Sequence, residues 1–270
     1  MPIAQTAKLA LPQSAGRVLR EGLTRVQRIT LKGTAVECPV CGSKFRRFIT
    51  FGDPARPNAQ CPRCGSLERH RLTWLFLERH TPILSDQLRV LHVAPEAGMS
   101  RRFRSLSNLD YVTADLDPER ADVQMDIMNI PFPDGQFDVV LCSHVLEHVE
   151  DANRAMAELR RVVAPTGFAL LDVPIDQSLQ DTYEDWTITS PRERAKAFGQ
   201  FNHVRWFGRN FPDLLRAAGF DVDVDPYPPS PDDTRRFGLR DAERAVISVD
   251  VLGHIYLCTR QDSSEVRVND

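Results

Sequence analysis

Four cysteines near the start of the 270-residue sequence fall into two CxxC pairs, Cys38 with Cys41 and Cys61 with Cys64. Each CxxC turn points two thiolates at one centre, and the glycine after each pair lets backbone amides approach the sulfurs. Two such turns supply the closed tetrahedral set of thiolates that structural zinc prefers. The sequence therefore predicts a structural Zn²⁺ in a zinc ribbon over residues 37–65. A redox dithiol and an iron–sulfur centre are the alternatives.

Basic and aromatic side chains alternate between the two cysteine pairs. Such a mixture can grip nucleic acid, but phenylalanines can also fill the small core of a ribbon, and we favour this second interpretation. The formal net charge of −3 supplies no strong field for nucleic acid or for an anionic membrane. Nucleic acid is therefore a partner that the composition does not favour. The residues concerned are Lys44, Phe45, Arg46, Arg47, Phe48 and Phe51.

A loop with an acidic residue, 92–99, follows the first strongly apolar run of the larger, C-terminal part of the chain. In doubly wound folds this loop binds the ligand, and a dinucleotide enzyme needs a GxGxxG pattern there. Only Gly98 is present here, and Glu96 would face a phosphate. S-adenosylmethionine carries an ammonium and a sulfonium but no phosphate, so an acid is acceptable beside it. The loop argues against NAD and favours S-adenosylmethionine.

Two further acids follow at positions that suit the same ligand. Asp115 ends the second apolar run, where its carboxylate can accept both hydroxyls of a ribose. Asp126 comes after it and can receive the amino group of adenine. A turn residue or a helix cap is the alternative for each acid.

Two histidines are candidates for a general base, which methyl transfer to a hydroxyl requires. His144 directly follows an apolar run, so we expect it beside the methyl group. His203 lies in a later polar and aromatic cluster, together with Arg205, which either binds an anionic acceptor or pairs with a neighbouring acid. A structural role is the alternative for both histidines.

Short apolar runs alternate with helical patterns, which is typical of a parallel sheet covered on both faces. The last two runs are joined without a helical pattern and can form an antiparallel hairpin. Ser66 is a candidate cap for the helix that connects the ribbon to this part, and residues 226–240 are expected to be a loop. Strands are predicted over 89–94, 110–115, 137–143, 168–174, 221–225 and 253–260, and helices over 17–29, 98–106, 151–163 and 208–218.

From about residue 88 to 175 the sequence resembles class I S-adenosylmethionine-dependent methyltransferases, in particular the type-11-like group with an FDVV…LEHV signature. The segments that carry the resemblance are 90–98, 137–149 and 159–168. It implies an α/β fold with a Rossmann-like, doubly wound, mostly parallel seven-stranded sheet. Where the family has two glycines and an acid in its first motif, this chain has Ala94, Glu96 and His92. The cofactor-binding residues that we expect are Ala94, Glu96, Gly98, Asp115, Asp126 and His144.

The expected organisation is a basic lead-in (1–36), the ribbon (37–65), a connecting helix (66–87), a methyltransferase domain (88–262) and a tail (263–270). Paired cysteines and the absence of an apolar span predict a cytoplasmic protein. We expect O-methylation of a small molecule or glycan with a histidine base. The Asn/Asp-Pro-Pro-Tyr/Phe motif of many amino-methylating nucleic-acid enzymes is absent. A nucleic-acid or protein methyltransferase guided by the ribbon and a non-catalytic cofactor-binding subunit are the alternatives.

Overall fold

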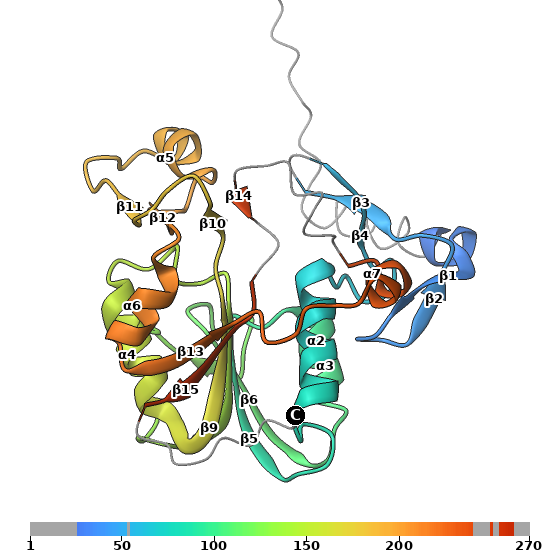
Figure 1. Ribbon diagram of the computed structural model, residues 1–270, viewed down its shortest axis with the longest axis horizontal. Coiled ribbons are helices and arrows are strands. Elements are labelled where there is room, and N and C mark those ends of the chain that lie inside the picture. The colour runs from blue at the N-terminus through green and yellow to red at the C-terminus, as the bar shows by residue number, and fades with distance from the viewer. Residues whose placement is uncertain (1–25, 53–54, 240–248, 251–253, 262–270) are drawn as a thin grey trace, which may run out of the picture.

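The computed structural model describes residues 26–52, 55–239, 249–250 and 254–261 (Figure 1). Its centre is a seven-stranded sheet in the order β13-β15-β9-β8-β5-β6-β7. Neighbouring strands are parallel except at β15, which is antiparallel to both β13 and β9. This confirms the predicted fold class. The strands are β5 (Leu88–Val93), β6 (Leu109–Asp115), β7 (Val123–Gln124), β8 (Phe137–Ser143), β9 (Val163–Asp172), β13 (Phe220–Val224) and β15 (Tyr256–Arg260).

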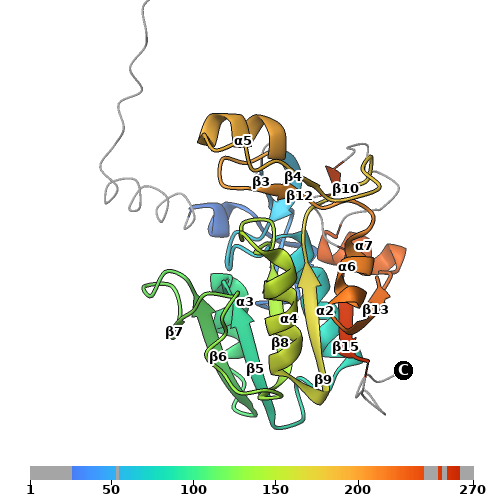
Figure 2. The same ribbon diagram turned by 90° about the vertical axis from the view of Figure 1, so that its left-hand side faces the viewer.

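Helices cover both faces of this sheet (Figures 1 and 2). Because successive side chains of a strand point to opposite faces, Leu91 belongs to one buried cluster and its neighbour Val90 to another. The cluster of Leu91 includes apolar residues of α4 (Ala152–Val162) and α6 (Phe211–Ala217). The cluster of Val90 includes residues of α2 (Glu68–His80) and α3 (Ala97–Phe103). The domain is therefore a three-layer α/β/α structure.

Most predicted elements are present with shifted ends. Strand β9 begins at Val163, five residues before the predicted start at 168, because Val163 already pairs with Phe137 before a register shift. The predicted helix over 208–218 begins only at Phe211 and has a proline in its first turn. The predicted helix over 17–29 lies mostly outside the described residues, of which 26–30 are helical.

The loop predicted over 226–240 is wrong for its second half, which forms α7 (Pro231–Phe237). Ser230 caps this helix by accepting from the amide of Asp233, and Pro231 occupies the first turn together with two acids. A serine followed by proline and acids is a helix-start signal. The proline-rich composition concealed that signal.

The ribbon consists of two small antiparallel pairs, β1 (Lys32–Cys38) with β2 (Ser43–Phe45) and β3 (Ile49–Phe51) with β4 (Arg56–Gln60). Phe45 and Phe48 are buried, as the core interpretation predicts, whereas Phe51 is 42% exposed. Both buried phenylalanines belong to the same apolar cluster as Trp74 of α2 and Phe103 of α3. The core of the ribbon is thus continuous with one face of the α/β domain.

Arg71 of α2 joins distant parts of the chain. This fully buried guanidinium donates to the carbonyl oxygens of Ala59 and Ser66 in the ribbon segment and to those of Phe237 and Gly238 at the end of α7. A buried charge is tolerated where hydrogen bonds satisfy it. Arg71 therefore fixes α2, the ribbon and α7 relative to one another, and α2 is more than a connecting helix.

A second group of short elements lies between β9 and α6, beyond the carboxyl ends of the parallel strands (Figure 1). Within the described ranges, no helix is long and apolar enough to cross a membrane. The inserted elements are β10 (Ile175–Asp176), which pairs with β14 (Val249–Asp250), β11 (Tyr183–Glu184), which pairs with β12 (Arg205–Trp206), and α5 (Pro191–Phe198).

Candidate active site and metal centre

The four predicted zinc ligands come together at one point. The Sγ atoms of Cys38 and Cys64 are 3.6 Å apart, and those of Cys41 and Cys61 are 3.8 Å apart. Four sulfurs around a tetrahedral zinc, each at about 2.3 Å, lie about 3.8 Å from one another. The group therefore has the dimensions of a closed zinc site, and its four thiols can hold the ion.

Ser66 contributes to this site instead of capping α2, which corrects the prediction. The cap residue is Leu67, whose amide donates to Nδ1 of His70. The hydroxyl of Ser66 lies 3.1 Å from Sγ of Cys38 and 3.2 Å from Sγ of Cys64. A hydroxyl in this position can donate to a metal-bound thiolate, and such outer hydrogen bonds orient metal ligands.

Three predicted cofactor residues meet at the carboxyl edge of adjacent strands. Ala94 follows β5, Asp115 ends β6 and His144 follows β8, and β5 pairs in parallel with both of the other strands. Ala94 (φ 48°) and His144 (φ 54°) have the left-handed backbone conformation, which is uncommon outside glycine and concentrates at functional sites. The chain thus turns sharply at both positions, beside the same edge.

The carboxylate of Asp115 is available to a ligand at this edge. Asp115 is 9% exposed, and its Oδ1 accepts from the amide of Asp117. Its Oδ2 is buried and has no hydrogen-bond partner among the described residues, and Nη1 of Arg120 lies 3.7 Å from it. A buried carboxylate oxygen without a hydrogen bond is costly, so Asp115 has the character of a binding residue.

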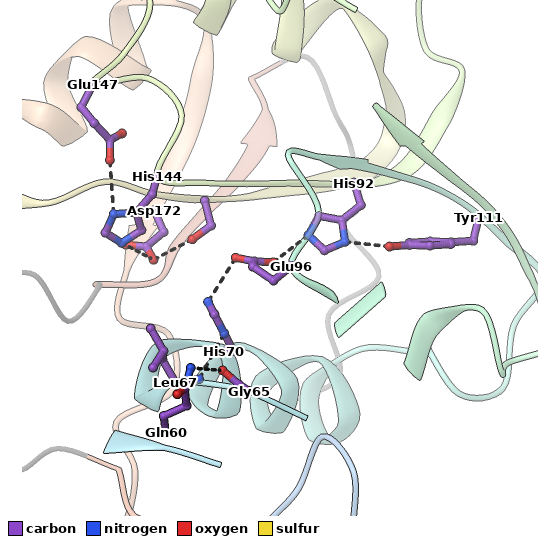
Figure 3. A network of polar contacts seen from close by, with 11 residues as sticks. Gln60, Gly65, Leu67, His70, His92, Glu96, Tyr111, His144, Glu147 and Asp172 are labelled. Carbon is purple, nitrogen blue, oxygen red and sulfur yellow. Dashed lines mark hydrogen bonds and ion pairs between the residues drawn. The ribbon is translucent and has the colours of Figure 1, made fainter. Parts of the chain in front are cut away.

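Glu96 lies between two histidines (Figure 3). Its Oε2 is 3.0 Å from Nε2 of His92, and its Oε1 is 3.2 Å from Nε2 of His70 on α2. Burial alone would raise the pKa of Glu96, but the contacts with both histidines outweigh it and hold the pKa well below its usual value. The acid remains charged beside the cofactor loop, and Nδ1 of His92 in turn contacts the hydroxyl of Tyr111.

Two other expected cofactor residues have different surroundings. A Cβ atom on Gly98 would lie 2.6 Å from the carbonyl oxygen of Cys64, so the glycine is required by the packing of α3 on the ribbon. Packing on the ribbon therefore accounts for the glycine, and the expected cofactor contact of Gly98 stays a prediction. Asp126 is exposed after β7, and its Oδ1 accepts from the amide of Met128.

His144 lies between the carboxylates of Glu147, which is fully buried, and Asp172, which is partly buried (Figure 3). Its Nδ1 is 3.2 Å from Oε1 of Glu147, and its Nε2 is 3.6 Å from Oδ2 of Asp172. Burial would raise the pKa of Glu147, but the contact with His144 more than reverses this effect and lowers it. Burial raises the pKa of Asp172. Glu147 is therefore placed to orient the imidazole, as an acid does in a catalytic triad.

His203, the other predicted base, packs against the turn that carries Glu147. Its Nδ1 is 3.0 Å from the carbonyl oxygen of Phe198, and its ring packs at 4.8 Å from the ring of His148. His203 is 2% exposed, and burial lowers its pKa to about 4. The structure thus brings His203 near Glu147 but encloses it.

Arg205 pairs with an acid, which is the second of its two predicted roles. It is 1% exposed, forms an ion pair with Glu184, and donates to the carbonyl oxygens of Leu146, Val149 and Glu150. The guanidinium therefore holds the turn that presents His144 and Glu147. Because Arg205 is buried, little of its guanidinium is accessible to a methyl acceptor.

Sequence reasoning missed Glu147, Asp172 and His70. Glu147 is fully buried in a turn, where it follows two apolar residues. An acid beside a histidine in such a stretch was the signal available. Asp172 and His70 had none, because only the fold brings them to His144 and Glu96.

Comparison with known proteins identifies the same region. Residues 79–171 match a family described as "Methyltransferase domain". The demethylmenaquinone methyltransferase of Geobacillus stearothermophilus is 31% identical over 114 residues, which cover 37% of this chain and 49% of that protein. A malonyl-[acyl-carrier protein] O-methyltransferase of Halorhodospira halophila is 27% identical over 167 residues, 56% of this chain and 53% of that protein. The chain spans about half the length of both relatives.

Among solved structures, that of the [4+2]-cyclase SpnF is 19% identical, with a TM-score of 0.48, over 72% of this chain and 81% of that one. The family match runs from the end of α2 through β5, β6 and β8 into β9, and so includes the edge where Ala94, Asp115 and His144 meet. Residues 79–171 therefore form a methyltransferase domain of the class I, S-adenosylmethionine-dependent kind.

Proposed function

We propose that this chain is a methyltransferase that takes its methyl group from S-adenosylmethionine and methylates a hydroxyl of a small molecule or glycan. The observation that carries the proposal is the buried Oδ2 of Asp115, which lacks a hydrogen-bond partner in the described structure. It lies at the edge where the chain turns at Ala94 and His144. When bound, the cofactor supplies a methyl group already activated on a sulfonium.

The chain's own residues would hold the cofactor as follows. Asp115 accepts the ribose hydroxyls, Asp126 receives the adenine amino group, and Glu96 presents a negative charge to the cationic methionine end. Ala94 turns the chain away so that backbone groups line the site. Since both oxygens of Glu96 already contact histidines, its attraction for the ammonium is weaker than that of a free carboxylate.

His144 is the base in this proposal. Its Nδ1 faces Glu147, and its Nε2 has no hydrogen-bond partner in the part of the chain described, so that Nε2 is the atom able to take a proton from the acceptor. His203 is less suited, because its ring is enclosed between His148 and Trp206. Asp172, 3.6 Å from Nε2, stabilises the charge that proton uptake creates.

The names of the two relatives specify demethylmenaquinone and malonyl-[acyl-carrier protein], and the first of these, a small molecule, supports a small acceptor. The alternative of nucleic acid gains no support from the ribbon. Its basic residues Arg46 and Arg47 are exposed, but of the three phenylalanines that could stack on bases Phe45 and Phe48 are buried and Phe51 alone is exposed.

Calorimetry on the zinc-loaded full chain tests the proposal directly. We expect S-adenosylhomocysteine to bind at one site per chain and NAD not to bind. Transfer of a labelled methyl group to members of a panel of hydroxylated small molecules and glycans would then identify the acceptor class. Tight binding of NAD, or no binding of S-adenosylhomocysteine, would overturn the proposal.

A further inference from the structure

A second group of metal-binding side chains lies beyond the four cysteines. One ligand atom from each of Glu147, His148 and His203 lies within 4.8 Å of the other two. We propose that these three residues bind a divalent transition-metal ion beside His144. This inference deepens the proposed function by adding a metal ion to the same active site, and its role in methyl transfer rests on that function.

The hydrogen bonds of the two imidazoles leave one nitrogen of each free. Nδ1 of His148 is 3.2 Å from the carbonyl oxygen of Asn202, and Nδ1 of His203 is 3.0 Å from that of Phe198. A carbonyl oxygen only accepts, so both Nδ1 atoms carry a proton, and in the neutral imidazole the lone pair of each ring is then on Nε2, where it can bind an ion. Metal-bound histidines usually donate their other nitrogen to a carbonyl or carboxylate in this way.

The candidate ligand atoms of Glu147 and His203 are buried, which makes them costly without a ligand. Nε2 of His203 and both oxygens of Glu147 have no hydrogen-bond partner among the residues described, and the exposed fractions of these two residues are 2% and 0%. Buried polar atoms in folded proteins are nearly always satisfied. An ion that accepts lone pairs from a carboxylate and two imidazoles would satisfy all of them together.

The backbone holds the three residues in this arrangement. Glu147 and His148 are adjacent on the turn after β8, and the amide of Val204 donates to the carbonyl oxygen of Glu147. That bond places His203, the residue before Val204, against the turn. Arg205 donates to three other carbonyl oxygens of the same turn and does not neutralise the Glu147 carboxylate.

The ligand set indicates the kind of ion. Two imidazoles and one carboxylate, with the remaining positions open, suit first-row divalent ions such as Mn²⁺, Fe²⁺, Co²⁺ and Zn²⁺. Oε1 of Glu147 lies 3.2 Å from Nδ1 of His144 and 4.0 Å from Nε2 of His148, so the carboxylate faces both the proposed base and the proposed ion. The open positions would bind an acceptor oxygen and lower the pKa of its hydroxyl, next to the histidine proposed as base.

Manganese is the probe that separates this site from the ribbon. Mn²⁺ binds N/O/S sites more weakly than Zn²⁺ and prefers carboxylate ligands, so it does not displace zinc from four thiolates. We expect the zinc-loaded full chain, titrated with Mn²⁺ and followed by electron paramagnetic resonance, to bind one Mn²⁺ per chain. Glu147→Gln and His148→Gln should each weaken binding by at least the roughly 10–100-fold seen when only an outer partner is lost.

His80→Gln is the matched control, because His80 lies on α2, packed on Phe76 and Tyr227, and should leave Mn²⁺ binding unchanged. His148 is partly exposed, so His148→Gln is less disruptive to folding than Glu147→Gln. No Mn²⁺ bound by the zinc-loaded wild type, or unchanged binding in both variants, would overturn the inference. Binding of S-adenosylhomocysteine, measured on the same samples, reports separately on the proposed function.

Discussion

Oε1 of Glu96, in the loop after the first sheet strand, lies 3.2 Å from Nε2 of His70 on α2. The same histidine accepts the amide of Leu67 at the start of its helix, directly after the ribbon. One imidazole thus joins the start of α2 to the loop that we expect to bind the cofactor.

The contact predicts a pH dependence of stability. The pKa of His70 is lowered from 6.5, because burial outweighs the attraction of Glu96, with Arg69 and His144 acting in the same direction as burial. Below about pH 6.5 the unfolded chain therefore takes up a proton that the folded chain refuses, and stability falls. We expect His70→Gln to reduce the slope of unfolding free energy against pH between 7 and 5.5, by up to about 1.4 kcal/mol per pH unit. Urea titrations of wild type and variant at several pH values, with zinc in excess, would measure these slopes. Equal slopes in the two proteins would contradict the prediction.

The zinc site should stabilise the whole described chain. Phe45 and Phe48 of the ribbon share a core with Trp74 and Phe103, so loss of the ion should lower the melting temperature of one common transition. We expect one Zn²⁺ per chain by elemental analysis, with a binding free energy of about 10–16 kcal/mol coupled to folding. Cys38→Ser should abolish the binding of this zinc ion.

Ser66→Ala gives the milder test of the same site. Loss of the hydroxyl beside two sulfurs should weaken zinc binding by about 10–100-fold without removing a ligand. Competition with a chelator would measure the change. A variant that holds zinc as tightly as the wild type would show that Ser66 does not support the thiolates.

Gly98→Ala tests whether packing on the ribbon, and not the predicted cofactor contact, requires the glycine. The added methyl would lie 2.6 Å from a backbone oxygen of Cys64, and such overpacking costs about 1–3 kcal/mol. We expect a destabilised chain whose affinity for S-adenosylhomocysteine is close to that of the wild type at a temperature where both are folded. Equal stability, together with a loss of that affinity, would restore the original interpretation.

The sequence predicted the sheet and the cysteine site well because both depend on local signals. A short apolar run such as 137–143 indicates a buried strand from its own residues. The two CxxC turns form a metal site once the fold brings them together. The seventh strand, Val123–Gln124, is two residues long, too short for any periodicity, and only the family resemblance implied it.

The details of the site were harder to predict, because they depend on which elements pack together. His70 reaches Glu96 only because α2 lies on the same face of the sheet as His92, and the sequence separation gives no sign of it. Gly98 was assigned to the cofactor from its place in the motif. The sequence gives no sign that the ribbon packs on α3 at Gly98, so a packing role for this glycine could not be predicted.

Asp115→Ala tests the cofactor site. Removing the carboxylate should weaken binding of S-adenosylhomocysteine by about 1.5–3 kcal/mol, the usual value of hydrogen bonds to a charged group. Asp117→Ala is the matched control, since that exposed acid lies two residues away and its carboxylate accepts only the amide of Glu119 among the bonds described. Calorimetry at one pH would measure both. If the two variants bind alike, the ribose is held elsewhere.

His144→Gln tests the catalytic base. If the acceptor is a hydroxyl, the variant should turn over about 10²–10⁴-fold more slowly with nearly unchanged cofactor affinity, because glutamine cannot take the proton. Glu147→Gln should also slow turnover, since it removes the charge 3.2 Å from Nδ1 of His144. The two variants are distinguished by metal binding, which Glu147→Gln should lose and His144→Gln should keep. Full turnover in His144→Gln would instead indicate that proximity alone drives transfer, as expected for an amine or thiolate acceptor.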